Sequence, residues 1–203
     1  MHPKSYQTDI NKKMTKIAIF ASGSGTNAEN LIKSFQHTTI RVSRVYCNNA
    51  KAGVIDRANR LNVPVTIFSK VDLWEQSTVI DSLCAEQIDF IVLAGFMMLL
   101  PQTIIDAYRN KIINIHPSLL PKYGGKGMFG QHVHEAVLAN AEKESGITIH
   151  LVNEEYDSGK PLFQTTCAVE PNDTPDTLAA RVHELEYRYY PKIVSEYIID
   201  KMK

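Results

Sequence analysis

KIAIFASGSGTN, residues 16–27, is the stretch of sequence that decides the fold. Lys16–Ala21 is a mostly apolar, β-branched run, which predicts a buried strand. Four apolar residues after it recur with helical spacing, at Ala28, Leu31, Ile32 and Phe35. We therefore predict a strand that turns directly into an amphipathic helix, with Thr26 as the helix cap.

Ser22–Asn27, the turn between this strand and this helix, is rich in glycine. Glycines let a ligand approach the backbone closely, and the free N–H groups and positive dipole end at a helix start favour a phosphate. The turn lacks the Walker A pattern, and Ala28 stands where the last glycine of GxGxxG would lie. From these residues alone, a monophosphate site and a plain strand-to-helix turn both remain open.

The same alternation of strand and helix continues along the first half of the chain. Four further apolar runs predict strands at Ile40–Cys47, Val63–Ile67, Ile88–Ala94 and Ile112–Ile115. Two more helical stripes lie between them, at Val54, Ile55, Ala58 and Leu61 and, more loosely, at Leu73, Ile80, Leu83 and Cys84. Strands that alternate with helices predict βαβ units around a parallel sheet.

Beyond Pro117 the chain changes character. A loop rich in Gly and Pro (Leu120–Gly130) precedes a short helical segment near Gln131–Asn140. The turn Asp157-Ser158-Gly159 separates two expected strands, Gly146–Val152 and Pro161–Val169, which predicts an antiparallel hairpin. Thr174 and Pro175 should open a C-terminal helix that Pro191 kinks or splits. The fold class is therefore α/β, a Rossmann-like, mostly parallel sheet flanked by helices and closed by antiparallel strands.

Composition narrows the classes of partner. The 203 residues suit one domain, which we place at residues 14–203 behind a flexible extension at residues 1–13. Lys plus Arg and Asp plus Glu number 22 each, which favours small molecules over nucleic acid or a membrane. The longest apolar run, Phe90–Leu100, is too short to span a bilayer. Three separated cysteines, Cys47, Cys84 and Cys167, argue against disulfides and structural zinc and fit the cytoplasm.

Asn114 and His116 lie at the carboxyl end of an expected central strand, within NIHPSLLP. In an extended chain residues i and i+2 share a face, so both side chains should point into the crevice where α/β sheets bind ligands. An amide can hydrogen-bond a developing oxyanion, and an imidazole can move a proton at neutral pH. The alternative is a pair that satisfies turn backbone.

Asp157 lies in the turn between the two expected antiparallel strands. A carboxylate near His116 would raise the imidazole pKa and hold the imidazolium in place, although such an Asp is also an ordinary turn former. The sequence gives less support for a metal site or for a covalent nucleophile. His132 and His134 form an HxH without accompanying acidic or Cys ligands, so we expect surface or supporting residues and no metal. No GxSxG elbow is present, which favours direct transfer without a covalent enzyme intermediate.

Four motifs together, SGSGTN, LAGFM, NIHPSLLPKY and HLVNEEYDSG, resemble the glycinamide ribonucleotide formyltransferases, from about Lys16 to Tyr197. The resemblance implies formyl transfer from 10-formyltetrahydrofolate to the amine of glycinamide ribonucleotide, in purine synthesis. It further implies a catalytic set in which Asn114 and protonated His116 stabilise the oxyanion, while Asp157 supports His116 and helps, through water, to move protons. His150 is either a supporting residue or a strand histidine that faces solvent. The implied enzyme is a monomer or homodimer.

The resemblance also assigns the ligand-binding residues. Gly25, Thr26 and Asn27 would hold the ribonucleotide phosphate, and Glu186 would bind the ribose hydroxyls. The folate pterin would lie against two segments, whose residues are Met97, Met98, Leu99 and Leu100 and then Asn153, Glu154, Glu155, Tyr156 and Asp157, beside Asn114. Apolar walls with backbone polar groups suit that heterocycle.

Two stretches depart from the family pattern. Met98 stands where the family often has Arg, and Leu61–Phe90 contains no Arg that would reach the folate glutamate tail. The loop Tyr123–Gly130 is longer and more glycine-rich than the common form, which suggests a mobile lid. Lys126 in this loop is either a contact for an anionic ligand or a solvated lysine.

Three competing functions share part of this pattern. Formyltetrahydrofolate deformylases share the Asn, His and Asp set but usually carry a regulatory domain before it. Methionyl-tRNA formyltransferase needs a basic C-terminal domain, and this chain has no surplus positive charge. A nucleotide-binding module without catalysis is permitted by the fold alone, although the joint presence of Asn114, His116 and Asp157 weighs against it.

Overall fold

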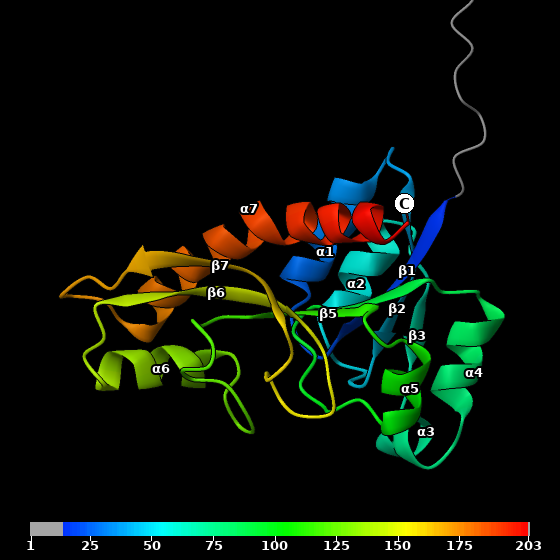
Figure 1. The fold of residues 1–203 in the computed structure, drawn as a ribbon, viewed down its shortest axis with the longest axis horizontal. Helices are drawn as coiled ribbons and strands as arrows, with labels where there is room; N and C mark the ends of the chain where they lie inside the picture. The colour runs from blue at the N-terminus through cyan, green and yellow to red at the C-terminus, as the bar shows by residue number, and fades with distance from the viewer. Residues whose placement is uncertain (1–13, 203) are drawn as a thin grey trace, which may run out of the picture.

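The computed structural model describes residues 14–202, so the expected extension at residues 1–13 lies outside the described residues. Its seven strands are β1 (Thr15–Ala21), β2 (Ile40–Cys47), β3 (Val65–Ile67), β4 (Phe90–Leu93), β5 (Ile112–His116), β6 (Glu144–Leu151) and β7 (Pro161–Ala168). They form one sheet in the order β3-β2-β1-β4-β5-β6-β7. The first five pair in parallel, whereas β6 and β7 run antiparallel to their neighbours, which confirms the predicted mixed sheet (Figure 1).

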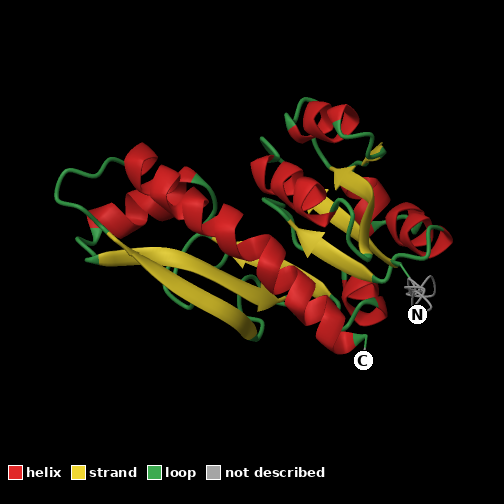
Figure 2. Ribbon diagram, turned by 90° about the horizontal axis from the view of Figure 1, so that it is seen from above, coloured by secondary structure: helices red, strands yellow, loops and turns green. Residues whose placement is uncertain are grey.

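Helices cover both faces of the parallel part of the sheet (Figure 2). Those on one face are α1 (Thr26–Phe35), α2 (Val54–Arg60) and α7 (Pro175–Lys201), and those on the other are α3 (Lys70–Trp74), α4 (Thr78–Ala85) and α5 (Gln102–Ala107). The alternation of β1 supplies both faces, because Ile17 and Ile19 belong to the first core and Ala18 and Phe20 to the second. The remaining helix, α6 (Gln131–Ala139), packs against α7.

The strand order reverses next to β1. The chain leaves β1 toward β2 and β3 and returns through β4 on the other side of β1. In open α/β sheets, ligands bind at such a reversal, outside the carboxyl ends of the strands. The backbone joins the two strand ends there, because Ser22 N–H donates to Gly95 O at 3.0 Å.

The start of α1 differs from the sequence prediction. Thr26 is the first helical residue, and the cap is Gly25, with φ +78° and no side-chain cap hydrogen bond. A Cβ on Gly25 would lie 2.4 Å from Val54 Cβ. The left-handed conformation and the packing of α1 against α2 both require glycine at the cap position, so Thr26 is displaced into the helix.

The third predicted helical stripe is two helices. Ser69 and Asp72 form a capping box that starts α3, which ends at Trp74, and α4 begins anew at Thr78. Cys84 is exposed and is not part of the apolar face. The helix α5 is an additional element, which begins after Pro101 and buries Ile104 and Ile105. This helix is too short for its few apolar residues to show a helical periodicity in the sequence.

The prolines shift other boundaries. The strand β3 begins at Val65, two residues later than Val63, because Pro64 has no N–H to give to a ladder. The helix α7 begins with Thr174 as cap and Pro175 at its first turn, as predicted. It is not split at Pro191. The proline leaves the Tyr187 carbonyl without its helical donor, and Asn30 Nδ2 donates to that oxygen at 2.9 Å instead.

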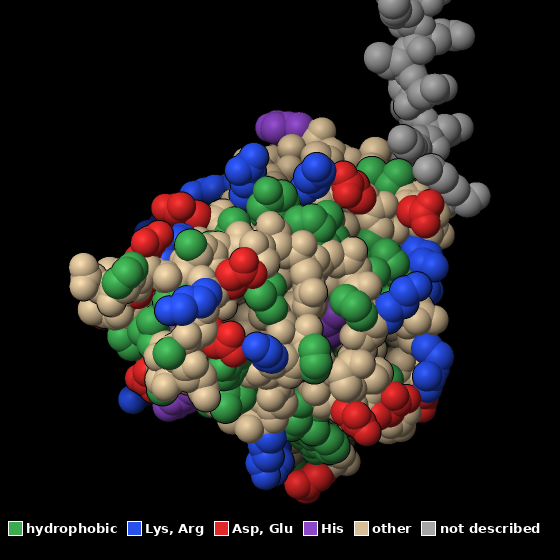
Figure 3. Space-filling model, turned by 60° about the vertical axis from the view of Figure 1, so that its left-hand side comes forward, with side chains coloured by type: hydrophobic (Ala, Val, Ile, Leu, Met, Phe, Trp, Pro, Cys, Tyr) green, Lys and Arg blue, Asp and Glu red, His purple; other side chains and the backbone are tan. Residues whose placement is uncertain are grey.

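The surface is mixed in charge. On the face in Figure 3, Lys and Arg side chains are interspersed with Asp and Glu, and no single sign dominates. No helix among residues 14–202 has the length and apolar character that a membrane span needs.

Candidate active site

One cavity of about 820 Å³ lies at the carboxyl ends of β1, β4 and β5. Its walls come from the turn after β1, the segment after β4, the end of β5, the glycine-rich loop before α6 with the start of α6, the end of β6 with the loop after it, and α7. We call the region of Ser22–Asn27, His183 and Glu186 the α1 end, and the region of Asn114, His116 and Asp157 the β5 end. Both ends open into this single cavity.

Asn114 and His116 line the cavity together, as the i, i+2 spacing predicts. Antiparallel pairing of β5 with β6 sets Asn114 opposite His150 and His116 opposite Thr148. His116 is 4% exposed, and its Nε2 lies 2.7 Å from the Tyr123 carbonyl oxygen. That contact holds a proton on Nε2, so the neutral ring has its lone pair on Nδ1.

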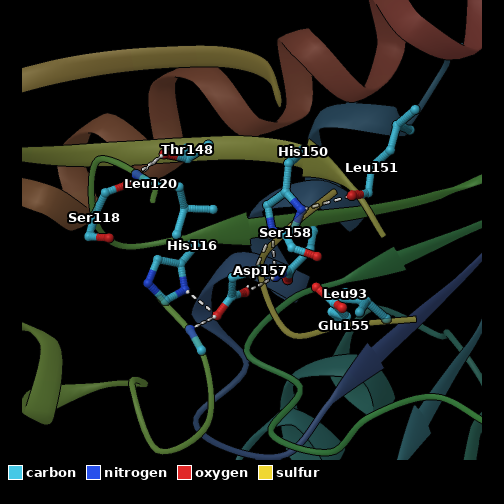
Figure 4. A network of polar contacts seen from close by, with 12 residues as sticks. Leu93, His116, Ser118, Leu120, Thr148, His150, Leu151, Glu155, Asp157 and Ser158 are labelled. Atoms are coloured by element: carbon cyan, nitrogen blue, oxygen red, sulfur yellow. Dashed lines mark hydrogen bonds and ion pairs between the residues drawn. The ribbon is translucent and has the colours of Figure 1, made fainter. Parts of the chain in front are cut away.

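Asp157 reaches the same place from the loop after β6 (Figure 4). Its Oδ2 lies 3.5 Å from His116 Nδ1 and accepts the Gly125 N–H at 2.9 Å. Its Oδ1 lies 3.4 Å from Asn114 Nδ2. Asp157 has φ +53°, a left-handed conformation that Asp tolerates better than most residues. The residue is therefore both a turn former and a partner of His116.

The protonation states follow from burial. Burial lowers the pKa of His116 below its usual 6.5, and the opposing effect of Asp157 does not compensate. The sequence-based expectation that Asp157 raises this pKa is thus outweighed by desolvation. Burial alone would raise the pKa of Asp157, but the polar contacts of its carboxylate, including the hydrogen bond from the Gly125 N–H, together lower it. At neutral pH the site pairs a neutral imidazole with a carboxylate, whereas the family resemblance implies a protonated His116.

His150 supports the β5 end and does not face solvent. It is 2% exposed, and its Nδ1 lies 2.8 Å from the Leu151 carbonyl oxygen. A proton on Nδ1 leaves Nε2 as the acceptor for Asn114 Nδ2, at 3.1 Å. This bond fixes the direction of the Asn114 amide. His150 therefore orients Asn114 within the cavity wall.

At the α1 end, the cavity is lined by Gly25, Thr26, Asn27 and Glu186. The Glu186 carboxylate is 4% exposed, and its Oε2 accepts hydrogen bonds from Asn27 Nδ2 and His183 Nδ1, both at 2.7 Å. The hydrogen bond to Glu186 raises the pKa of His183. Asn27 Oδ1 is buried without a partner among residues 14–202, which leaves an acceptor available there.

Two histidines line this cavity without having been predicted as site residues: His183 was not singled out, and His134 was expected to be a surface or supporting residue. His183 precedes Glu186 by three positions on a predicted helix, and that spacing places both on one face, so it offered a usable signal. His134 is 2% exposed and lines the cavity, whereas its neighbour His132 is exposed. Nothing in the HxH pattern distinguishes these two histidines.

The two segments expected to contact a pterin fare differently. Met97, Met98, Leu99 and Leu100 all line the cavity, as do Glu155, Tyr156 and Asp157. Asn153 and Glu154 do not. Asn153 Oδ1 accepts from Ser158 Oγ at 2.9 Å, and Glu154 pairs with Arg109 on the surface at 3.3 Å. These two side chains shape the loop and leave ligand contacts to their neighbours.

The glycine-rich loop forms the remaining wall. Gly125, Lys126, Gly127, Met128, Phe129 and Gly130 line the cavity. Lys126 is exposed, and the loop is fastened to Asp157 through the Gly125 N–H. The loop thus borders the β5 end directly. Among residues 14–202, no group of three or more His, Cys, Asp or Glu is arranged to hold a metal ion.

Comparison with known proteins matches residues 15–194 to the family described as formyl transferase. A chloroplastic phosphoribosylglycinamide formyltransferase of Arabidopsis thaliana is 37% identical over 93% of this chain and 67% of its own length. The Bacillus subtilis phosphoribosylglycinamide formyltransferase is 35% identical over 90% of this chain and 94% of its own.

Solved structures give the same result. The phosphoribosylglycinamide formyltransferase of Bacillus halodurans superposes with a TM-score of 0.83 at 34% identity, covering 93% of this chain and 97% of its own. The Coxiella burnetii enzyme has a TM-score of 0.79 at 37% identity, covering 89% and 85%. With this extent of similarity in both sequence and fold, the chain belongs to the formyl transferase family and, within it, to the phosphoribosylglycinamide formyltransferases.

Proposed function

We propose that this protein transfers the formyl group of 10-formyltetrahydrofolate to the amine of glycinamide ribonucleotide, a step of purine synthesis. One observation carries the proposal: a single cavity joins a helix start suited to a phosphate with a buried His116 and the half-buried Asn114 and Asp157. The first feature suits a phosphorylated acceptor, and the second suits acyl transfer.

The α1 end would hold the ribonucleotide. Gly25, Thr26 and Asn27 line the cavity at the start of α1, where free N–H groups and the helix dipole favour a phosphate. Oε2 of Glu186 already receives two hydrogen bonds, so its Oε1 is available to a ribose hydroxyl. The buried Asn27 Oδ1 is a second acceptor for such a hydroxyl.

The β5 end would carry out the transfer. As the substrate amine attacks the formyl carbon, Asn114 Nδ2 donates to the oxyanion, which replaces the long contact with Asp157 at 3.4 Å. Neutral His116 takes the proton that the amine loses and returns it to the folate nitrogen when the old C–N bond breaks. Asp157 stabilises the imidazolium that exists between these two steps.

The folate would lie between the β4 and β6 sides of the cavity. The walls there are mostly apolar and include Phe96, Met98, Leu100 and Val152, which suits a flat heterocycle. Met98 occupies the position of the family's frequent Arg, and its Sδ accepts from Asn48 Nδ2 at 3.2 Å. A folate glutamate tail is therefore not bound by a cation at this position.

The free thiols of Cys47, Cys84 and Cys167 suit a reducing compartment, and we propose the cytoplasm.

A spectrophotometric assay with 10-formyltetrahydrofolate, run with and without glycinamide ribonucleotide, tests the function. We expect turnover only when the ribonucleotide is present. Equal release of folate product without the ribonucleotide would identify a deformylase, because water would then be the acceptor. Folate binding with no turnover in either case would identify a binding module.

A further inference from the structure

The hydroxyl of Ser22, the first residue of the glycine-rich turn, makes two hydrogen bonds within the protein. Its Oγ donates to Asn48 Oδ1 at 2.7 Å and accepts the Met97 N–H at 3.0 Å. The side chain has one proton to donate, and the residue is only 7% exposed. Ser22 therefore does not serve a phosphate, although it belongs to the same turn as Gly25 and Thr26.

Asn48 completes the connection from the end of β2. Its Oδ1 accepts from Ser22, and its Nδ2 donates to Met98 Sδ at 3.2 Å. The backbone adds the bond from Ser22 N–H to Gly95 O. The ends of β1, β2 and β4 are thus fastened together at one point, which lies between the α1 end and the Met97–Leu100 segment.

We propose that Ser22 and Asn48 are positioning residues that hold the Ser22–Asn27 turn and the Met97–Leu100 segment in a fixed relation, so that the two substrates meet in register. The inference rests on the proposed function, which places the ribonucleotide on the first segment and the folate on the second. Neither side chain contacts substrate in this account.

The expected kinetic signature follows from where the connection acts. Each segment keeps its own ligand contacts when the connection is cut, so each substrate alone still binds. The distance between the amine and the formyl carbon, however, is no longer fixed, and small misplacements of reacting groups slow a reaction strongly. A loss of kcat with nearly constant KM is therefore expected.

The experiment compares Ser22→Ala, Asn48→Ala and the double variant with Tyr46→Phe as matched control. The control removes one side-chain hydrogen bond from β2, between Tyr46 and Ser82 at 2.9 Å, outside the cavity. We expect each single variant to lower kcat about tenfold, the effect of one net hydrogen bond, with both KM values within about threefold. Tyr46→Phe should keep its kcat.

The double variant and a conservative variant sharpen the test. Because Ser22 and Asn48 share one of the three side-chain hydrogen bonds at this point, the double variant should lose less kcat than the product of the two single losses. Asn48→Asp keeps the acceptor for Ser22 and loses only the contact with Met98, so its kcat should stay within about threefold of the unaltered chain. Urea unfolding of every variant controls for loss of folded protein.

The possible outcomes distinguish a wrong proposed function from a wrong positioning role for Ser22 and Asn48. If the unaltered chain shows no ribonucleotide-dependent turnover, the proposed function is wrong and this inference falls with it. If turnover is present but Ser22→Ala and Asn48→Ala behave like Tyr46→Phe, or change one KM without kcat, the inference alone is wrong. Additive losses in the double variant would also overturn it.

Discussion

The two ends of the cavity are assembled over different distances along the chain. The backbone of the α1 end comes from one continuous strand–turn–helix unit, whose turn is shaped by Gly25 against Val54. The β5 end joins Asn114 to His150 and Asp157, which are 36 and 43 residues away in sequence. A binding surface can thus be formed locally, whereas the acid–base set depends on the antiparallel pairing of β5 with β6.

This difference predicts that chemistry fails when the β5 end is altered and that binding or stability fails when the α1 end is altered. The largest effect is expected for Asp157→Asn. We predict a fall in kcat of roughly 10²- to 10⁴-fold, because the amide no longer stabilises the His116 imidazolium. The asparagine keeps an acceptor for the Gly125 N–H and tolerates the left-handed φ, so urea unfolding should change little.

Glu154→Gln is the matched control for Asp157→Asn. It removes a carboxylate from the same loop, but one that lies outside the cavity beside Arg109. Its kcat should match that of the unaltered chain. An Asp157→Asn variant that keeps more than about a tenth of the original turnover would show that Asp157 is only a turn former.

Gly25→Ala should break the α1 end through its backbone. The φ of +78° strains an alanine, and the new Cβ would approach Val54 Cβ to 2.4 Å. We expect the free energy of unfolding to fall by about 2–5 kcal/mol, the combined cost of left-handed strain and overpacking. Urea denaturation measures this loss.

The comparison variant is Gly127→Ala, at φ +89° but in open space. Gly127→Ala should lower the free energy of unfolding only by the cost of the left-handed backbone strain, about 1–2 kcal/mol. Equal losses in the two variants would mean that the packing of the turn against α2 contributes nothing.

Glu186→Gln should separate binding from chemistry. Hydrogen bonds to a charged group contribute about 1.5–3 kcal/mol, so the KM for glycinamide ribonucleotide should rise roughly 10- to 100-fold. The KM for the formyl-folate should not change, since the side-chain partners of Glu186 are Asn27 and His183, which belong to the α1 end and not to the Met97–Leu100 segment. Steady-state kinetics with each substrate varied in turn measures both values.

Glu184→Gln provides the control, because Glu184 lies on the same helix but is exposed. A parallel rise of the two KM values in Glu186→Gln would argue for general disturbance of the cavity and against ribose binding.

The smallest effect concerns pH. His116 acts as a base only when neutral, and burial keeps its pKa below 6.5. The value of kcat/KM should therefore be level near neutral pH and fall with an inflection below 6.5, about tenfold per pH unit. An inflection above 6.5 would contradict the dominance of burial.

The free energy of unfolding should also decrease at acidic pH. The unfolded chain binds a proton at His116 near pH 6.5, before the folded chain does, so the free energy of unfolding falls as the pH drops below that value. Urea titrations at several pH values check this, and His116→Gln should reduce the slope.

Much of the α1 end could be predicted because its signals are local. The glycines between a strand and an amphipathic helix sufficed to locate the turn, and the mixed sheet followed from the pattern of apolar runs. The cap assignment to Thr26 was wrong because the need for glycine at position 25 comes from Val54, which is 29 residues away. Packing between α1 and α2 leaves no trace in the local sequence.

Less of the β5 end could be predicted, because its residues come together only in the folded chain. The shared face of Asn114 and His116 followed from strand geometry, but the place of Asp157 beside them came only from the family resemblance. Sequence spacing also overestimated the carboxylate's influence on His116, since burial is a property of the folded protein. The exclusion of Asn153 and Glu154 from the cavity depends on loop conformation, which their residue types do not reveal.

The most direct test of the account is a crystal structure with glycinamide ribonucleotide and a formyl-folate analogue that cannot react. The account predicts the phosphate on the N–H groups of Gly25, Thr26 and Asn27, the ribose on Glu186, and the amine within about 3.5 Å of the formyl carbon beside Asn114 and His116. A phosphate bound at Lys126 instead, or an amine directed away from His116, would contradict it.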